Sequence, residues 1–403
     1  MEHLHLHPGT LWPAILRQTE HALRLGALRP IETIQTLLEE RGICFLVRQV
    51  SSLARKEETR QSRKVEVGAC SAVNPFLPYD PDLFVADLSD THVALLNKFN
   101  VIDHHLLIVT RCFKPQDALL EFADFVALAA CMAEFDGLGF YNGGAESGAS
   151  QRHKHLQIVP LPLGESGPPL PIESVIRPGG IEGLIGTVPG LPFLHAFGRL
   201  ELAPAASPHA ANAAIDCYHA LLEATGLRAI KVNGELHQSA PYNLLVTRRW
   251  MLLVPRHSEC VEGISVNALG FAGSLFVRDA AQMEVIKRLG PMSVLKRVAV
   301  PAAAGRPGPS VWRFRFKTDP QRREYAQALI VNRASDGGVV QALPGVILRG
   351  RQCVHFVIDK APEPWGIERI NTVNVGHNKC ADSGWIATTF RPSLNGQGLP
   401  DAK

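Results

Sequence analysis

The sequence predicts an α+β protein, and three observations lead to this fold class. Apolar residues between 116 and 134 repeat with a period near 3.6, which predicts an amphipathic helix. The short apolar run 106–109 and the run 228–233 have the pattern of strands. A glycine-rich loop over 142–151 leads directly into another strand-like run at 152–159. The chain is therefore expected to combine strands with a small number of helices.

The other elements follow from the same periodicities, taken along the chain. Strand-rich segments are predicted at 45–110 and 242–256, whereas the Pro and Gly content of 161–192 predicts an irregular connection. Pro30 separates the first two helical patterns. Besides 116–134, helices are predicted at residues 10–27, 31–41, 208–226 and 279–289.

Length and composition indicate an ordinary folded protein. The chain has 403 residues, enough for two or three domains, with 46% apolar and 20% charged residues. No apolar run approaches the roughly 20 residues needed to span a bilayer, and the N-terminal pattern is not that of a signal peptide. The eight cysteines form no Cys-x-x-Cys pair, which argues against a zinc ribbon and against a disulfide scaffold. We therefore expect a cytoplasmic protein with reduced thiols.

Charge is unevenly distributed along the chain. Residues 301–403 contain 14 Lys and Arg against 8 Asp and Glu, whereas residues 1–300 contain 27 against 30. The main body is therefore not a general binder of polyanions, and a phosphate site in it must be local. Residues 301–312 have the composition of a linker. Residues 313–403 are predicted to be a basic C-terminal extension of unknown role, which leaves nucleic-acid binding open although the rest of the chain argues against it.

A weak internal repeat relates two apolar segments. The segments from His104 to Arg111 and from Arg249 to Arg256 each place four apolar residues between a polar or bulky pair and an arginine. Two core strands of similar composition would give the same pattern, so the repeat alone does not establish a duplicated structure.

The strongest candidate site is His153-x-His155-x-Gln157, directly after the glycine-rich loop. Side chains alternate between the two faces of a strand, so these three residues are predicted to share one face. Burying three polar groups on one face is costly without partners, which suggests that this face lines a cleft. Ordinary surface or core histidines are the alternative interpretation of the two imidazoles taken by themselves.

The glycine-rich loop is predicted to bind phosphate. Glycines permit positive φ values and allow consecutive backbone N–H groups to converge on an anion. The segment is not a P-loop, because Ala149 stands where the lysine is required and a strand follows where a helix should. A neutral histidine beside phosphate can attack phosphorus, and a glutamine amide can donate a hydrogen bond without activating water. The pattern favours a covalent nucleotidyl-enzyme and transfer to a second acceptor.

At these residues the chain resembles the diadenosine tetraphosphate (Ap4A) phosphorylases, also called ATP adenylyltransferases. They belong to the histidine-triad superfamily, on the branch shared with galactose-1-phosphate uridylyltransferase. The resemblance covers roughly residues 1–300. It rests on the loop 144–151, the His-x-His-x-Gln motif, and residues 74–78, 97–101, 159–162, 241–247 and 250–256.

The resemblance implies phosphorolysis of Ap4A, in which ATP leaves, inorganic phosphate accepts the adenylyl group, and ATP and ADP are the products. It implies that His155 is the nucleophile, that His153 orients the site and that Gln157 contacts the intermediate. A third histidine occupies the position of Gln157 in branches that hydrolyse, so Gln157 favours a transferase. The implied substrate contacts are Lys56, Asn97, Lys98, Asn142, Gly148, Ala149, Ser150, Gln151, Asn243, Thr247 and Arg256.

The resemblance also implies the architecture of residues 1–300. This is an antiparallel sheet of the histidine-triad and uridylyltransferase type with flanking helices, built from two pseudo-repeated halves. The catalytic half would span about 45–165, and a degenerate second half about 195–300. Because the chain lacks a Cys-x-x-Cys pair, we expect none of the zinc found in uridylyltransferase relatives. The implied partners are a nucleotide with its Mg²⁺ and inorganic phosphate, with no bound organic cofactor, no membrane and a monomeric chain.

Three other functions are compatible with these residues. A histidine-triad hydrolase of dinucleoside polyphosphates would turn over without phosphate. A non-catalytic nucleotide-binding protein would retain its affinity after replacement of His155 by alanine. A metal-dependent enzyme with His153 and His155 as ligands would be sensitive to a chelator beyond what magnesium restores.

Overall fold

The chain divides into two compact units, one made of Met1–Ile181 and Thr187–Ala304 and the other containing Gly305–Lys403. In the second unit, β17 (Phe314–Phe316) pairs with β19 (Phe356–Ile358), and β18 (Val340–Gln341), β21 (Ile386–Ser393) and β20 (Thr372–Lys379) form a sheet in that order. No helix in the described part of the chain is long and apolar enough to cross a membrane. Besides the five strands of the second unit, this computed structural model describes residues 3–51, 74–165, 167–176, 185–202, 208–232 and 234–302.

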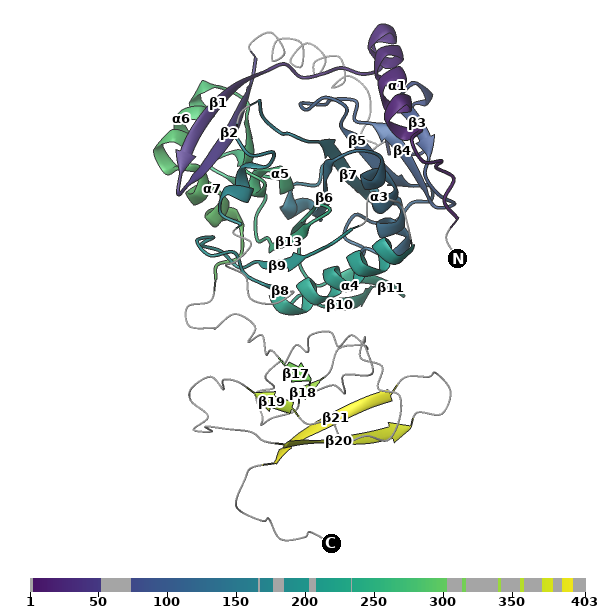
Figure 1. The fold of residues 1–403 in the computed structure, drawn as a ribbon. Coiled ribbons are helices and arrows are strands. Elements are labelled where there is room, and N and C mark those ends of the chain that lie inside the picture. Colours follow the sequence, from purple (N-terminus) through teal and green to yellow (C-terminus); the bar gives the residue numbers. More distant parts are fainter. Residues whose placement is uncertain are drawn as a thin grey trace. The chain divides into compact units, whose positions relative to one another are not determined.

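Eight strands of a nine-stranded sheet form the centre of the first unit (Figure 1). Every pair of its strands for which a register is defined runs antiparallel, so the predicted α+β class with a large antiparallel sheet is confirmed. The order of the strands is β3 (Phe84–Asp87), β4 (His92–Leu96), β5 (Leu106–Thr110), β7 (His155–Pro160), β6 (Gly137–Gly143), β12 (Tyr242–Val246), β13 (Trp250–Pro255), β9 (Ala196–Arg199) and β8 (Ile185–Gly186).

The central strands are ordered symmetrically about the boundary between β6 and β12. On one side β6 pairs with β7 and β7 with β5, and on the other side β12 pairs with β13 and β13 with β9. A helix precedes each inner hairpin. Helix α3 (Phe122–Glu134) comes directly before β6. Helix α4 (Pro208–Thr225) comes before β12, and the strands β10 (Ala229–Val232) and β11 (Glu235–Gln238) lie between them in the sequence. Two pseudo-repeated halves would produce this order.

The repeat read from the sequence, however, aligns the wrong strands. The segments His104 to Arg111 and Arg249 to Arg256 correspond to β5 and β13. By its place in the sheet, β13 is the counterpart of β7, and β5 is the counterpart of β9. The two segments are similar because both contain a strand that is buried along its whole length.

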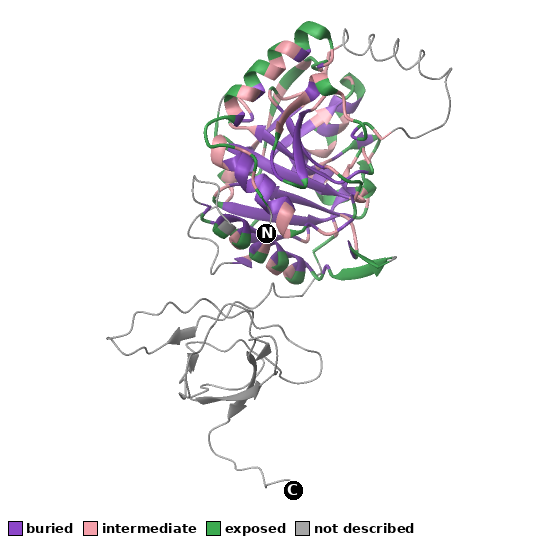
Figure 2. Ribbon diagram, turned by 90° about the vertical axis from the view of Figure 1, so that its right-hand side faces the viewer, coloured by how far each residue is buried: buried purple, intermediate pink, exposed green. Residues whose placement is uncertain are grey.

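Two layers cover the sheet, and together they determine which side chains can reach solvent. Helices α3 and α4 lie side by side on one face, where Gly139 leaves room for Leu128: a Cβ atom there would lie 2.7 Å from a leucine methyl (Figure 1). The apolar core on the other face joins Phe140 and Leu252 of the sheet to residues of the second layer. In Figure 2 the strands between these layers are buried.

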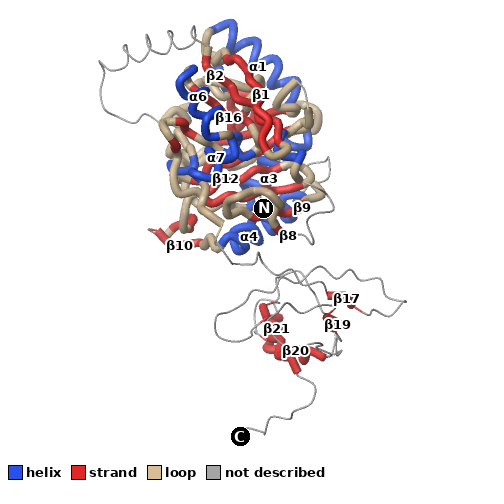
Figure 3. Tube along the Cα trace, turned by 90° about the vertical axis from the view of Figure 1, so that its left-hand side faces the viewer, coloured by secondary structure: helices blue, strands red, loops and turns tan. Residues whose placement is uncertain are grey.

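The second layer consists of a small sheet and three helices, and Figure 3 shows the sheet beside two of these helices, α6 (Ala280–Leu289) and α7 (Pro291–Val298). Its strands β2 and β16 run parallel. Its members are β1 (Thr33–Glu40), β2 (Ile43–Val50), β16 (Ser274–Val277), α5 (Ala268–Phe271), α6 (Ala280–Leu289) and α7 (Pro291–Val298). The remaining elements of the first unit are α1 (Leu11–Leu25), η1 (Pro81–Leu83), η2 (Ala145–Ser147), η3 (Pro171–Ser174), β10 (Ala229–Val232), β11 (Glu235–Gln238), β14 (Cys260–Val261) and β15 (Ile264–Ser265).

The predicted helix at 31–41 is wrong, because this segment is strand β1. Ile34, Leu37 and Leu38 have helical spacing, but the chain reverses at Arg41 and Gly42, whose φ values are 54° and 77°. Two consecutive positive φ values form the tight turn that joins antiparallel strands. Strand β1 therefore pairs along its length with β2, from Glu40 opposite Ile43 to Thr33 opposite Val50.

The predicted helix at 116–134 begins later than expected, at Phe122. Glu121 and Asp124 form a capping box, in which each side chain accepts a hydrogen bond from the backbone of the other residue. Residues before the cap are used elsewhere, and Gln116 makes contacts in the candidate site. The strand predicted at 152–159 likewise begins later, at His155, so that His153 lies just before it in an isolated bridge with Pro115.

Candidate active site

The glycine-rich loop connects β6 to β7 and is folded on itself. Gly144 and Gly148 have φ values of 99° and 88°, which favour glycine. The N–H groups of Gly148 and Ala149 donate to the carbonyls of Ala145 (2.9 Å) and Gly144 (3.3 Å). They are therefore unavailable as the predicted phosphate donors. Among the described residues, the N–H groups that follow them, at 150 and 151, have no hydrogen-bond partner, so these are the loop donors that are free to meet an anion.

His155 is the first residue of β7, and its ring is held by one hydrogen bond. Nδ1 donates to the carbonyl of His153 at 2.8 Å, so the neutral ring has its lone pair on Nε2. No described residue forms a hydrogen bond with this Nε2 atom. Burial is the main reason that the pKa of His155 is lowered to about 4. The ring is therefore neutral near pH 7 and has one free basic nitrogen.

His153 has both ring nitrogens occupied by protein groups. Nε2 donates to the carbonyl of Thr110 (2.8 Å), and Nδ1 accepts from Nδ2 of Asn74 (3.0 Å). The ring of Phe76 lies 5.6 Å from that of His153 and 5.3 Å from that of His155, so both imidazoles lie on one side of the sheet as predicted. His153 orients His155 through its backbone carbonyl and has no ring nitrogen left for a substrate.

Gln157 lies two residues beyond His155 on the same face of β7. Its Oε1 atom accepts a hydrogen bond from Nε2 of His105 at 3.0 Å. Asn97 donates from Nδ2 to Nδ1 of the same imidazole at 3.1 Å, so this predicted substrate contact is committed to a protein group. Lys98 is 39% exposed and lies 3.7 Å from a carboxylate oxygen of Asp80. Lys98 is the neighbour of Asn97 in the sequence, but its ammonium group is already paired with Asp80.

Asn142, Asn243 and Arg256 support the loop from behind. Nδ2 of Asn243 donates to Oδ1 of Asn142 and to the carbonyl of Ser147, both at 2.8 Å. Arg256 donates to Oδ1 of Asn243 and to the carbonyls of Ser147 and three further residues. All three side chains are buried, and every donor of Asn243 and Arg256 is occupied by the protein. Nδ2 of Asn142, in contrast, has no hydrogen-bond partner among the described residues. All three were predicted as substrate contacts, but the structure uses the donors of Asn243 and Arg256 to fix the loop. For Asn142 the substrate contact stays a prediction, because its amide NH₂ is free.

Two other predicted contacts lie outside this cluster. Thr247 lies at the far end of β12 from Asn243, four residues away or about 13 Å along a strand. Its hydroxyl accepts from the N–H groups of Arg249 (3.1 Å) and Trp250 (3.0 Å), so it stabilises the turn into β13. Lys56 lies outside the described residues.

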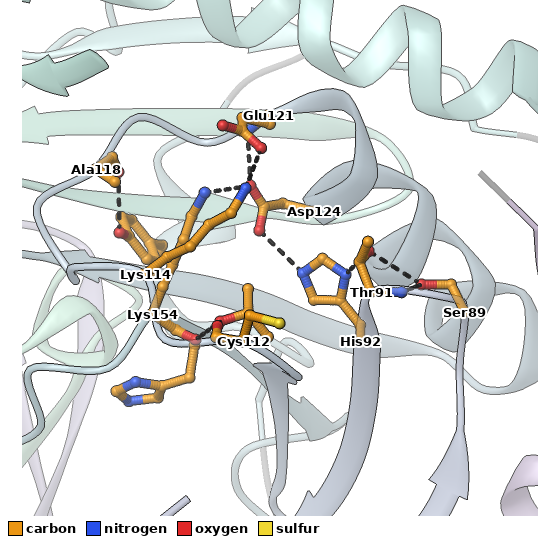
Figure 4. A network of polar contacts seen from close by, with 12 residues as sticks. Ser89, Thr91, His92, Cys112, Lys114, Ala118, Glu121, Asp124 and Lys154 are labelled. Atoms are coloured by element: carbon orange, nitrogen blue, oxygen red, sulfur yellow. Dashed lines mark hydrogen bonds and ion pairs between the residues drawn. The ribbon is translucent and has the colours of Figure 1, made fainter. Parts of the chain in front are cut away.

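The residue between the two histidines points to the opposite face of the sheet and anchors the strand. Figure 4 shows Lys154, Asp124 and His92 directed toward one another beneath α3. Nζ of Lys154 lies 2.6 Å from Asp124, and Nε2 of His92 lies 3.0 Å from the other carboxylate oxygen. Burial alone would raise the pKa of Asp124, but Lys154 and His92 outweigh it and lower the pKa to about 2. This buried ion pair ties the start of β7 to the N-terminus of α3.

Sequence reasoning missed four residues of the site: Asn74, His105, Thr110 and Gln116. Gln116 joins both ends of the loop, because Nε2 donates to the carbonyl of Asn142 (2.9 Å) and Oε1 accepts from the N–H of His155 (2.9 Å). Of these four residues, only Asn74 lies in one of the segments on which the resemblance to the Ap4A phosphorylases rests, residues 74–78. Within the described ranges, no three His, Cys, Asp or Glu side chains come together as a metal-binding group.

The comparisons with known proteins agree with this geometry. A model of the Ap4A phosphorylase N-terminal domain matches residues 1–178, and a model of the ATP adenylyltransferase C-terminal domain matches residues 189–301. Diadenosine tetraphosphate phosphorylase 2 of Saccharomyces cerevisiae is 29% identical over 243 residues, which are 53% of this chain and 71% of the relative. Protein APA1 of the same organism is 26% identical over 274 residues, which are 62% and 80% of the two chains.

Solved structures support the fold. The crystal structure of yeast Ap4A phosphorylase Apa2 is 24% identical with a TM-score of 0.60, over 75% of this chain and 98% of that one. The same yeast protein in complex with Ap4A gives a TM-score of 0.58, over 74% and 100% of the two chains. Two consecutive family matches, which together span most of residues 1–301, and a common fold establish that this chain belongs to the Ap4A phosphorylase family.

Proposed function

We propose that this protein catalyses the phosphorolysis of Ap4A by inorganic phosphate to give ATP and ADP. The observation that carries the proposal is the state of His155. Its ring is buried and neutral, and its Nε2 atom is free. The residue also lies shortly after a loop whose N–H groups at 150 and 151 are unpaired among the described residues. The yeast relatives support the choice of substrate, because one is named a diadenosine tetraphosphate phosphorylase and a similar structure is a complex with Ap4A.

In the first step, Nε2 of His155 attacks the α-phosphorus of Ap4A. An N–P bond forms as the bond from phosphorus to the bridging oxygen breaks, and ATP leaves with the electron pair. The Nδ1–H bond to the carbonyl of His153 supports the positive charge that develops on the ring. The N–H groups at 150 and 151 and the amide of Gln157 would donate to the non-bridging oxygens, where negative charge increases.

In the second step, an oxygen of inorganic phosphate attacks the adenylyl phosphorus. The N–P bond breaks, ADP is released and His155 recovers its lone pair. Gln157 is neutral and lacks a basic nitrogen, so the site has no group at this position that would activate water. We propose that Mg²⁺ enters on the oxygens of the polyphosphate, which are the ligands it prefers.

The proposal is tested by product analysis. The protein is incubated with Ap4A and Mg²⁺, with and without inorganic phosphate, and the nucleotides are separated by anion exchange. Equal amounts of ATP and ADP that appear only with phosphate are the expected result. ATP and AMP formed without phosphate would indicate a hydrolase instead, and Ap4A binding without products would indicate a non-catalytic binding protein.

The intermediate is tested separately with Ap4A labelled at the α-phosphorus. Without inorganic phosphate, label should remain on the protein in an amount up to one per chain, with release of ATP. Added phosphate should discharge it as ADP. His155→Ala should retain no label, whereas the matched control His195→Ala, which removes another buried imidazole, should be labelled normally.

A further inference from the structure

Gln157 is held by two consecutive hydrogen bonds that the proposed reaction does not use. Asn97, just after β4, donates to Nδ1 of His105, and His105, just before β5, donates from Nε2 to Oε1 of Gln157. The backbone N–H of Asn97 also donates to the carbonyl of His105 at 2.9 Å, so the first two residues are fixed relative to each other. The ring of Phe140 lies 5.6 Å from the imidazole and keeps it in place.

The direction of this chain of donors determines which end of Gln157 is free. Burial lowers the pKa of His105 to about 4, so the ring is neutral and has a single N–H. Because Nδ1 accepts from Asn97, that N–H is on Nε2, and Gln157 must offer its oxygen to it. The amide NH₂ of Gln157 is then the free end, with no hydrogen-bond partner among the described residues.

The opposite direction would damage the site. If Nδ1 of His105 had the proton, Nε2 would accept from the amide NH₂ of Gln157, and the amide oxygen would be the free end. That oxygen would then face the anionic phosphate on the side of His155. A lone pair directed at an anion is repulsive, whereas an N–H donor stabilises it.

We propose that His105 is a positioning residue that, together with Asn97, directs the amide NH₂ of Gln157 toward the phosphate attached to His155. This inference rests on the proposed function, since it assigns Gln157 the role of a donor in the reaction. His105 itself touches no substrate. It acts by preventing rotation of the Gln157 amide.

The test replaces His105 with one residue that lacks a hydrogen-bond donor and with one that retains a donor. His105→Leu removes the N–H, and we expect kcat for phosphorolysis to fall about 10- to 100-fold with KM changed less than about threefold. His105→Gln keeps an amide N–H near the position of Nε2 and should recover most of this loss. A kcat of His105→Leu within twofold of wild type would overturn the proposal, as would equal losses in the two folded variants.

A double-mutant cycle separates positioning from general damage. If His105 acts only through Gln157, then His105→Leu combined with Gln157→Leu should be no slower than Gln157→Leu alone. If the two losses multiply, His105 acts independently and the inference is wrong. Thermal melting of each variant identifies loss of folded protein.

A spectroscopic measurement keeps this inference separate from the proposed reaction. Nitrogen-15 NMR of the histidine rings should find His105 as the Nε2–H tautomer, with no protonation between pH 8 and 5. An Nδ1–H tautomer would overturn the inference even if Ap4A is turned over. Failure of the wild-type protein to form ATP and ADP would instead overturn the proposed function, and the NMR result would still report the direction of the hydrogen bonds.

Discussion

His155 and His195 have almost the same local structure and different chemical prospects. In each residue Nδ1 donates at 2.8 Å to the carbonyl two residues earlier, and an aromatic ring lies within 6 Å of the imidazole. Burial lowers the pKa of both rings. The difference is at Nε2, which is free in His155 but accepts a hydrogen bond from the N–H of Val188 at 2.8 Å in His195.

This comparison separates the proposed nucleophile from a structural histidine. A low pKa and a fixed tautomer are shared by both residues, so neither property distinguishes the reactive one. What distinguishes His155 is an unused lone pair beside a loop that can hold an anion. His195 spends the same lone pair on a backbone N–H group and thereby stabilises the approach to β9.

The largest difference should appear when each imidazole is removed. His155→Ala eliminates the nucleophile, and we expect kcat/KM for Ap4A to fall at least about 1,000-fold. His195→Ala removes a ring with no part in the reaction and should retain activity per folded molecule within about twofold. Steady-state assays normalised to folded protein check both values, and similar losses in the two variants would invalidate the distinction.

The pH dependence of the reaction sharpens the comparison. Attack requires the unprotonated Nε2 of His155, whose pKa is about 4. The quantity kcat/KM should therefore be nearly constant from pH 8 to 5 and fall only as the pH approaches 4. A histidine with the ordinary pKa of about 6.5 would lose roughly 30-fold by pH 5. If kcat/KM falls with a midpoint near pH 6.5 while fluorescence shows that the protein is folded, then His155 is not the buried, neutral imidazole that the structure shows.

The loop beside His155 supplies the second requirement, and Gly148→Ala should impair it. The residue has φ of 88°, and a Cβ atom would lie 2.9 Å from the carbonyl oxygen of Val266. We expect kcat/KM to fall about tenfold, because strain of about 1–2 kcal/mol would be relieved by moving the phosphate-binding end. Gly167→Ala is the matched control, since Gly167 has the same φ and nothing within 4 Å of the added carbon. Equal effects of the two changes would show that backbone strain alone is responsible.

How much of this site is readable from the sequence depends on whether its parts are neighbours in the chain. The loop and the His-x-His-x-Gln strand are contiguous, so their order alone predicts that the imidazoles share one face beside the loop. The family resemblance then implies that His155 is the nucleophile. His105 and Gln116 reach the same site from other segments, and their positions follow from strand register and from contacts that local periodicity does not encode.

The same reasoning explains the errors. The helical spacing of Ile34, Leu37 and Leu38 could not reveal the Arg41–Gly42 turn that makes the segment a strand. The resemblance implied that Arg256 and Asn243 contact the substrate, but in the structure protein groups occupy every one of their donors. Polar residues near a candidate anion site can either bind the ligand or fix the surrounding backbone. Only their hydrogen-bond partners in the folded structure distinguish these two roles.

The smallest expected effect is on His195, and it tests whether its lone pair is structural. His195→Leu leaves the N–H of Val188 buried without an acceptor, which should lower the free energy of unfolding by about 1–3 kcal/mol. His195→Gln can offer Oε1 to the same N–H and should lose less stability.

The pH dependence of this loss tests whether His195 is held neutral. Because burial lowers the pKa of His195 in the folded state, the unfolded chain binds its proton first as the pH falls, so wild type loses stability below about pH 6.5. His195→Leu lacks this proton linkage, and its deficit relative to wild type should therefore narrow between pH 7 and 5. Denaturant unfolding at the two pH values measures this, and a deficit that stays constant or widens would mean that His195 is not held neutral by its surroundings.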